Sequence, residues 1–171
     1  DNIVVAGHPL GASLYGPEGF SQIDVPLLMV GGSEDIVAPV AVEQFHPFIW
    51  LQTEAKYLAM LDIGTHFSSK PGRDGAGGIF ALLAGANRDI GSAYYKALSV
   101  AFYNAYLRGQ EEYLAYLTAS YGNQLSDGLP MGLSIITDLQ PEQIEATYGR
   151  RPPFPIIPAP LAATVSPRAE S

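Results

Sequence analysis

Two apolar segments with a helical segment between them constrain the fold of this chain more than any other feature. Residues 26–30, PLLMV, and residues 56–63, KYLAMLDI, are short aliphatic runs that end at glycine, which is typical of buried strands. Residues 40–51 have a helical pattern, with Pro39 at the first turn. A strand, a helix and a second strand joined by short connections predict a parallel pair, and therefore an α/β sheet with helices on its faces.

A third strand is predicted at residues 2–6, where a β-branched run closes at Gly7. Residues 7–25 carry glycine and proline at short intervals, so they are predicted to form a loop without a helix. A parallel unit of three strands has open edges, and such edges are usually covered or paired. We therefore expect residues 1–150 to be the C-terminal part of a larger, doubly wound α/β sheet followed by helices, with an N-terminal half that lies upstream.

Helices dominate the region after the third predicted strand. A helix capped by Asp89 carries apolar residues at three- and four-residue spacing and ends at Gly109. Further helices are expected at residues 111–121 and from about Pro141.

Two segments are expected to lack regular structure. The glycine-rich residues 71–78 are predicted to form a mobile loop. Residues 151–171 are rich in proline, alanine and serine, and are predicted to form a disordered tail outside the folded domain.

The composition narrows the class of protein. Hydrophobic residues make up 47% of the 171 residues and charged residues 15%, so one domain with a real core is expected. The net charge of −8 argues against nucleic acid or an anionic membrane as a partner, because both need a basic face. The absence of cysteine excludes disulfides and thiolate chemistry. The sequence contains no transmembrane run and no targeting segment, so cytoplasmic and exported locations both stay open.

An acid and a histidine follow two neighbouring predicted strands. Asp35 comes just after the strand at 26–30, and His66 comes just after the strand at 56–63. Catalytic groups in open α/β sheets gather at the carboxyl ends of strands. We therefore expect Asp35 and His66 to share a hydrogen bond, with Asp35 orienting the imidazole and His66 acting as a general base.

Each residue taken alone has a plainer interpretation. An aspartate after a strand is usually a turn or cap residue, and a lone histidine at a strand end is usually structural. Their occurrence together at matching strand ends favours catalysis. Glu34 is the alternative acid, whereas His8 lies in the glycine- and proline-rich loop and His46 lies mid-helix.

The segments around Asp35 and His66 resemble a known superfamily. The runs IDVPLLMVGGSEDIVAPV and KYLAMLDIGTHFS, together with LYGPEGFSQIDVP and YYKALSVAFYNAYL, are similar to the α/β-hydrolases. The branch that they resemble is the bacterial predicted dienelactone hydrolases, which are related to platelet-activating-factor acetylhydrolases and cutinases. The resemblance covers roughly residues 1–150. It implies Asp35 as the triad acid, His66 as the triad base, and a nucleophilic serine upstream of these residues.

The stretch VVAGHPLGAS is one residue away from the G-x-S-x-G turn that presents the serine in this superfamily, with Pro9 at the serine position. Because a loop without a helix is expected after it, the stretch resembles the strand before the acid strand. There are two weaker alternatives. The stretch could be a degenerate nucleophile turn that has lost its serine, or Ser13 could be a displaced nucleophile. The loop residues His8, Pro9, Leu10 and Ser13 are candidates for lining the substrate cleft, although packing for structural reasons is equally compatible.

The resemblance implies a serine hydrolase of carboxylic esters, acting on a small-molecule, lipid or polyester ester, with no cofactor and no metal. The 171 residues alone are expected to be inactive, because they contribute the acid and the histidine without a positioned serine. The alternative from another class is a non-catalytic binding module that keeps the hydrolase shape. A G-x-S-x-G motif upstream in the coding sequence would favour the enzyme.

Overall fold

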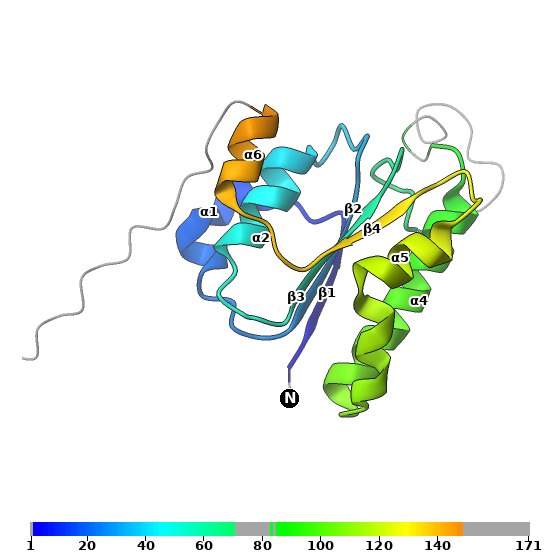
Figure 1. Cartoon of the computed structure of the whole chain (residues 1–171). Coiled ribbons are helices and arrows are strands. Elements are labelled where there is room, and N and C mark those ends of the chain that lie inside the picture. Colours follow the sequence, from blue (N-terminus) through cyan, green and yellow to red (C-terminus); the bar gives the residue numbers. More distant parts are fainter. Residues whose placement is uncertain (1, 71–82, 84, 149–171) are drawn as a thin grey trace, which may run out of the picture.

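The computed structural model describes residues 2–70, 83 and 85–148, so the predicted mobile loop at 71–78 and the predicted tail at 151–171 lie outside the described residues. Within the described part, a four-stranded sheet carries helices on both faces (Figure 1). The elements in chain order are β1 Val4–Gly7, α1 Ala12–Phe20, β2 Leu27–Gly32, the π-helix η1 Ala41–Phe45, α2 His46–Trp50, β3 Lys56–Leu61, α4 Arg88–Leu107, the 3₁₀-helix η2 Glu111–Leu117, α5 Ala119–Ser126, β4 Leu133–Ile136 and α6 Pro141–Tyr148.

The sheet has the strand order β1-β2-β3-β4. The first three strands are parallel, with Val4 beside Leu27 and Leu27 beside Lys56. This confirms the three predicted strands and their parallel arrangement. The sequence did not predict β4, which runs antiparallel to β3 and places Ile136 beside Leu58.

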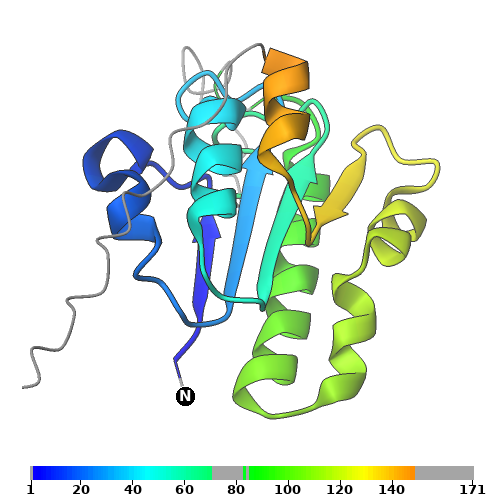
Figure 2. The same ribbon diagram turned by 60° about the vertical axis from the view of Figure 1, so that its left-hand side comes forward.

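The two faces of the sheet are covered by different helices (Figures 1 and 2). One face packs against α4, η2 and α5, and its fully buried residues include Leu28, Val30, Ala59, Leu61, Leu98 and Phe102. The other face packs against η1 and α2, and its buried residues include Leu27, Met29, Leu58, Met60, Phe48 and Leu51. Because both faces of β2 and β3 are buried, their sequences are continuous apolar runs without polar alternation.

The prediction that no helix follows the first strand is wrong. Helix α1 begins at Ala12, and it is interrupted at Gly16, where φ is 58° and ψ is −173°. Gly16 separates two short helical turns, and Pro17 opens the second of them, where a missing N–H costs little. Glycine and proline therefore divide this helix into two turns, and they do not exclude it.

The remaining helices agree with the predictions in position but differ in detail. Helix α4 follows Asn87, so Asp89 lies in the first turn and is not the cap. The helix predicted at residues 111–121 is divided into η2 and α5, and Thr118 caps α5 by accepting a hydrogen bond from the backbone N–H of Tyr121. No helix among the described residues is long and apolar enough to cross a membrane.

Candidate functional site

Asp35 lies in the loop after β2, at the carboxyl end of the parallel strands. Its side chain is 1% exposed. The Oδ1 atom accepts hydrogen bonds from the backbone N–H groups of Val37, at 2.9 Å, and Ala38, at 2.8 Å. The following turn therefore fixes one carboxylate oxygen and leaves Oδ2 directed to other partners.

His66 lies in the turn after β3, beside Asp35. Its Nδ1 atom is 2.9 Å from Asp35 Oδ2, and its side chain keeps 12% of its surface exposed. Ser68, which is fully buried, closes this turn by accepting a hydrogen bond from the backbone N–H of Thr65 at 2.8 Å. The structure thus brings Asp35 and His66 together as the sequence predicts, while their catalytic roles stay a prediction.

His8 is the second histidine on the same carboxylate. Its Nδ1 atom is 3.0 Å from Asp35 Oδ2, and its side chain is fully buried. The backbone of His8 has a φ of 49°, and its N–H donates to the carbonyl of Val30 at 2.6 Å. The sequence pattern indicated His8 as a residue of the substrate cleft and did not predict its contact with Asp35. The signal was present, since His8 directly follows the end of a strand, as Asp35 and His66 do.

Of the other predicted cleft residues, Pro9 and Leu10 lie between β1 and α1, and Ser13 lies in the first turn of α1. Side chains of η1 hold this segment in place. Glu43 Oε2 accepts the backbone N–H groups of Gly11 and Ala12 at 2.8 and 3.0 Å, and Gln44 Nε2 donates to the carbonyl of Pro9 at 3.3 Å. The hydroxyl of Ser13 donates to Glu43 at 3.4 Å.

Of the four candidate cleft residues, Ser13 is therefore bonded to Glu43, and Leu10 is 55% exposed. His8 is buried against Asp35 and is the member of this set that the structure joins to the Asp35–His66 pair.

Burial and hydrogen bonding set the charge states of the buried groups. Burial works to raise the pKa of Asp35, but the hydrogen bonds from Ala38, His66 and His8 outweigh it, so the pKa lies below its ordinary value. Burial lowers the pKa of His8, against the opposing effect of Asp35. Asp35 is therefore ionised and His8 neutral at neutral pH.

An ionised carboxylate only accepts hydrogen bonds. Both histidines must then carry a proton on Nδ1, where they face Asp35. For His66 this leaves Nε2 with a free lone pair, which is the form of imidazole that removes a proton from a neighbouring group. The arrangement can act as an oriented general base.

Two histidines and a carboxylate are also a donor set for zinc or iron. The three atoms lie within 4.8 Å of one another. However, both nitrogen-to-oxygen distances, 2.9 and 3.0 Å, are hydrogen-bond lengths, and they are shorter than the roughly 3.3 Å that separates ligand atoms around a tetrahedral zinc with bonds of about 2.0–2.1 Å. The geometry therefore favours hydrogen bonding at this cluster.

The turn that precedes His66 contains a strained residue. Ile63 has a φ of 54°, a conformation that β-branched residues rarely adopt. Its N–H donates to the hydroxyl of Ser33 at 2.8 Å, and its side chain is 41% exposed. The contact ties the histidine loop to the acid loop at the expense of local strain.

An Ile63→Asn variant is expected to be more stable than the wild type by about 0.5–1 kcal/mol, because asparagine tolerates the left-handed region. The Ile63→Val variant is the control, since it keeps the β-branch and the strain. Urea unfolding midpoints measure both. A lower midpoint for the asparagine variant would show that packing of the isoleucine side chain outweighs the strain.

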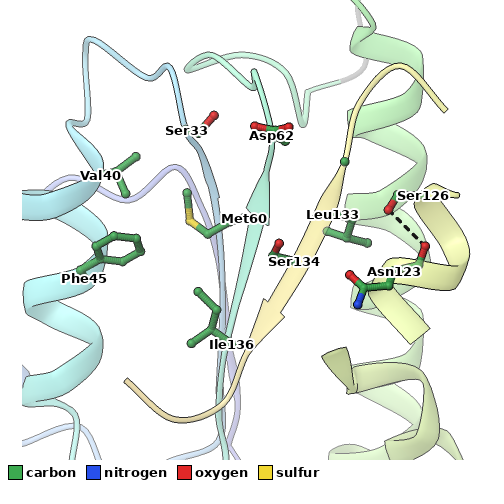
Figure 3. A pocket seen from close by; sticks show the side chains of 11 residues that line it. Ser33, Val40, Phe45, Met60, Asp62, Asn123, Ser126, Leu133, Ser134 and Ile136 are labelled. Carbon is green, nitrogen blue, oxygen red and sulfur yellow. Dashed lines mark hydrogen bonds between the residues drawn. The ribbon is translucent and has the colours of Figure 1, made fainter. Parts of the chain in front are cut away.

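A separate hollow of about 400 Å³ opens beside the antiparallel strand β4 (Figure 3). Apolar side chains from η1, β3 and β4 form one part of it, and polar side chains of α5 form another. Its lining residues are Ser33, Val40, Phe45, Met60, Asp62, Asn123, Ser126, Gly132, Leu133, Ser134 and Ile136. Neither Asp35 nor His66 is among them, so this hollow is distinct from the Asp35–His66 pair.

No family model matches the sequence, and no curated protein matches it. The fold and the site therefore define the class as a mostly parallel α/β protein with a buried carboxylate between two histidines at the carboxyl edge of its sheet.

Proposed function

We propose that the protein is a serine hydrolase of carboxylic esters, in which Asp35 orients His66 and His66 is the general base. The observation that carries the proposal is the 2.9 Å hydrogen bond between Asp35 Oδ2 and His66 Nδ1. It joins the loops that follow two adjacent parallel strands, which is where α/β enzymes gather their catalytic groups.

The proposed reaction needs a serine that faces Nε2 of His66. The serine oxygen attacks the ester carbonyl while His66 takes its proton, and His66 then gives that proton to the departing alcohol. Water, activated by the same imidazole, attacks the acyl-enzyme and releases the carboxylic acid and the free serine. Asp35 stabilises the imidazolium that forms in both steps.

We place the serine outside these 171 residues, in the other half of a doubly wound α/β-hydrolase sheet. Among the described residues, β1 pairs with β2 on one side and has no strand on the other, and Val4 on this edge is 38% exposed. Parallel sheets are normally continued or covered at such an edge. The hydroxyl of Ser13 is directed to Glu43, which supports a structural role for this serine.

The product of the complete gene is expected to hydrolyse p-nitrophenyl acetate and butyrate with saturable kinetics. A serine-directed fluorophosphonate should stop the reaction, and mass spectrometry of the labelled peptide should place the label outside residues 1–171. His46→Gln is the control, because His46 lies in α2 with its ring beside that of Trp50 and is not part of the Asp35–His66 pair.

Two results would contradict this proposal. A label on Ser13 would show that the nucleophile belongs to this segment. The absence of both turnover and labelling in the folded product would favour the non-catalytic binding module.

A further inference from the structure

His8 is a buried titratable group for which the proposed reaction has no use. Its side chain is fully buried, its Nδ1 atom faces Asp35, and its Nε2 atom has no hydrogen-bond partner among the described residues. A buried polar atom without a partner is costly. A phenylalanine or leucine would fill the same space without leaving a buried polar atom unpaired. The hydrogen bond from Nδ1 to Asp35 is therefore the feature that could account for a histidine at this position.

The carboxylate of Asp35 is saturated with donors. A carboxylate offers about four lone-pair positions. Two are occupied by the backbone N–H groups of Val37 and Ala38, and two by the Nδ1 atoms of His8 and His66. The histidines share one oxygen, Oδ2, so each reduces the negative charge that the other receives.

The segment that carries His8 is held rigidly from several sides. The carbonyl of Val30 fixes its backbone N–H, Gln44 fixes the next residue, Pro9, and Glu43 fixes the start of α1. His8 adopts a φ of 49° within this frame. The imidazole is therefore presented to Asp35 by a preorganised loop, which is what a precise contact requires.

We propose that His8 is a positioning residue for the Asp35–His66 pair, donating from Nδ1 to Asp35 Oδ2 so that the carboxylate stays aimed at His66 with part of its charge withdrawn. This inference rests on the proposed function. It goes beyond a triad of serine, histidine and acid, because it adds a second, non-reacting histidine that tempers how strongly the acid stabilises the imidazolium of His66.

Other charges near His8 do not alter how its replacement is expected to change the hydrogen bond between Asp35 and His66. The groups that act on it are Asp35, His66 and Lys70. Lys70 is present in the wild type and in both variants described below, so its effect on the histidine cluster does not differ between these proteins. A difference between the wild type and a variant therefore reports whether Asp35 Oδ2 is still shared by two donors.

Two substitutions separate the donor from the ring. In His8→Asn, the amide nitrogen occupies the place of Nδ1, and asparagine also tolerates a positive φ. In His8→Leu, the volume is similar but the donor is lost. Nuclear magnetic resonance of the ¹⁵N-labelled full chain reports the tautomer of His8 and the Nδ1–H proton of His66, whether or not esters are hydrolysed.

The wild type should show His8 as the neutral Nδ1–H tautomer. In His8→Leu, the Nδ1–H proton of His66 should move downfield, because Oδ2 is no longer shared. The acid limb of the kcat/KM profile should also move to higher pH, because a carboxylate that no longer shares Oδ2 stabilises the imidazolium of His66 more strongly. His8→Asn should restore both values, which a purely space-filling role for His8 would not require.

Three results would overturn the inference. One is an Nε2–H tautomer for His8 in the wild type, a measurement that needs no substitution. Another is a folded His8→Leu protein in which the His66 proton is unchanged. The third is stoichiometric Zn²⁺ binding by the wild type that both variants lose, since the cluster would then be a metal site. If the resonance shifts occur but no ester is hydrolysed, the positioning contact stands and the proposed function fails.

Discussion

Replacing His66 with glutamine is expected to lower kcat for aryl esters by about 10⁵–10⁶-fold, because removal of the base from a serine triad costs nearly as much as removal of the whole triad. Replacing Asp35 with asparagine is expected to lower kcat by about 10⁴-fold. Both values apply to the complete gene product under the proposed function, with kcat measured at saturating substrate.

The structure gives a specific reason for the effect of Asp35→Asn. The backbone N–H groups of Val37 and Ala38 require an acceptor, so the amide oxygen takes the place of Oδ1. The amide NH₂ group then faces Nδ1 of both histidines. Because NH₂ is a donor, each imidazole must move its proton to Nε2. His66 then lacks the lone pair that accepts the serine proton.

The His46→Gln variant controls for the loss of a histidine in general, and circular dichroism controls for folding. An Asp35→Asn protein that is folded and keeps more than about a tenth of the wild-type kcat would remove Asp35 from the mechanism, since a wrong tautomer cannot be that active. Equal losses of kcat in His46→Gln and His66→Gln would show that His66 is not the general base of the mechanism.

The strands and the pairing of Asp35 with His66 were predictable because they depend on local pattern and on one rule of topology. Aliphatic runs of five or six residues that end at glycine form buried strands. Once two such strands are parallel and adjacent, the residues that follow them must lie at the same edge of the sheet. No knowledge of side-chain packing was needed to bring Asp35 to His66.

Helix α1 was not predictable in the same way, because its start depends on a residue far along the chain. Gly11 and Ala12 donate their N–H groups to Glu43, which is about thirty positions away in the sequence and belongs to η1. The local signals, Gly16 and Pro17, indicate a break, and they do produce one. What they do not show is that a tertiary carboxylate caps the first turn.

Strand β4 left a weak signal. Leu133 and Ile135 are buried while Ser134 is exposed, which is the alternation expected of a strand with one face on the core. With only four residues, the segment is too short for that alternation to stand out. Its position is decided by pairing with β3, where Leu61 lies beside Leu133.

The acid loop and the histidine loop approach each other through a pair of glycines. A Cβ atom added to Gly32 would lie 2.3 Å from the carbonyl oxygen of Gly64. The backbone N–H groups of Ser33 and Glu34 donate to the carbonyls of Leu61 and Gly64, at 3.0 and 2.8 Å. The two loops are therefore joined backbone to backbone just beneath Asp35 and His66, and any side chain at Gly32 must push them apart.

A Gly32→Ala variant is consequently expected to lose about 2–3 kcal/mol of unfolding free energy, the range for overpacking a site that cannot relax through a flexible side chain. It should also lose most of its kcat, because separating the loops lengthens the hydrogen bond between Asp35 and His66.

Gly109→Ala is the matched control. Gly109 has a φ of 65° and no atom within 4 Å of an added Cβ, so it tests backbone strain alone, about 1 kcal/mol. Urea unfolding of the two variants gives the comparison. Equal losses would mean that the loops separate freely, and that backbone contact between them does not hold the acid against the histidine.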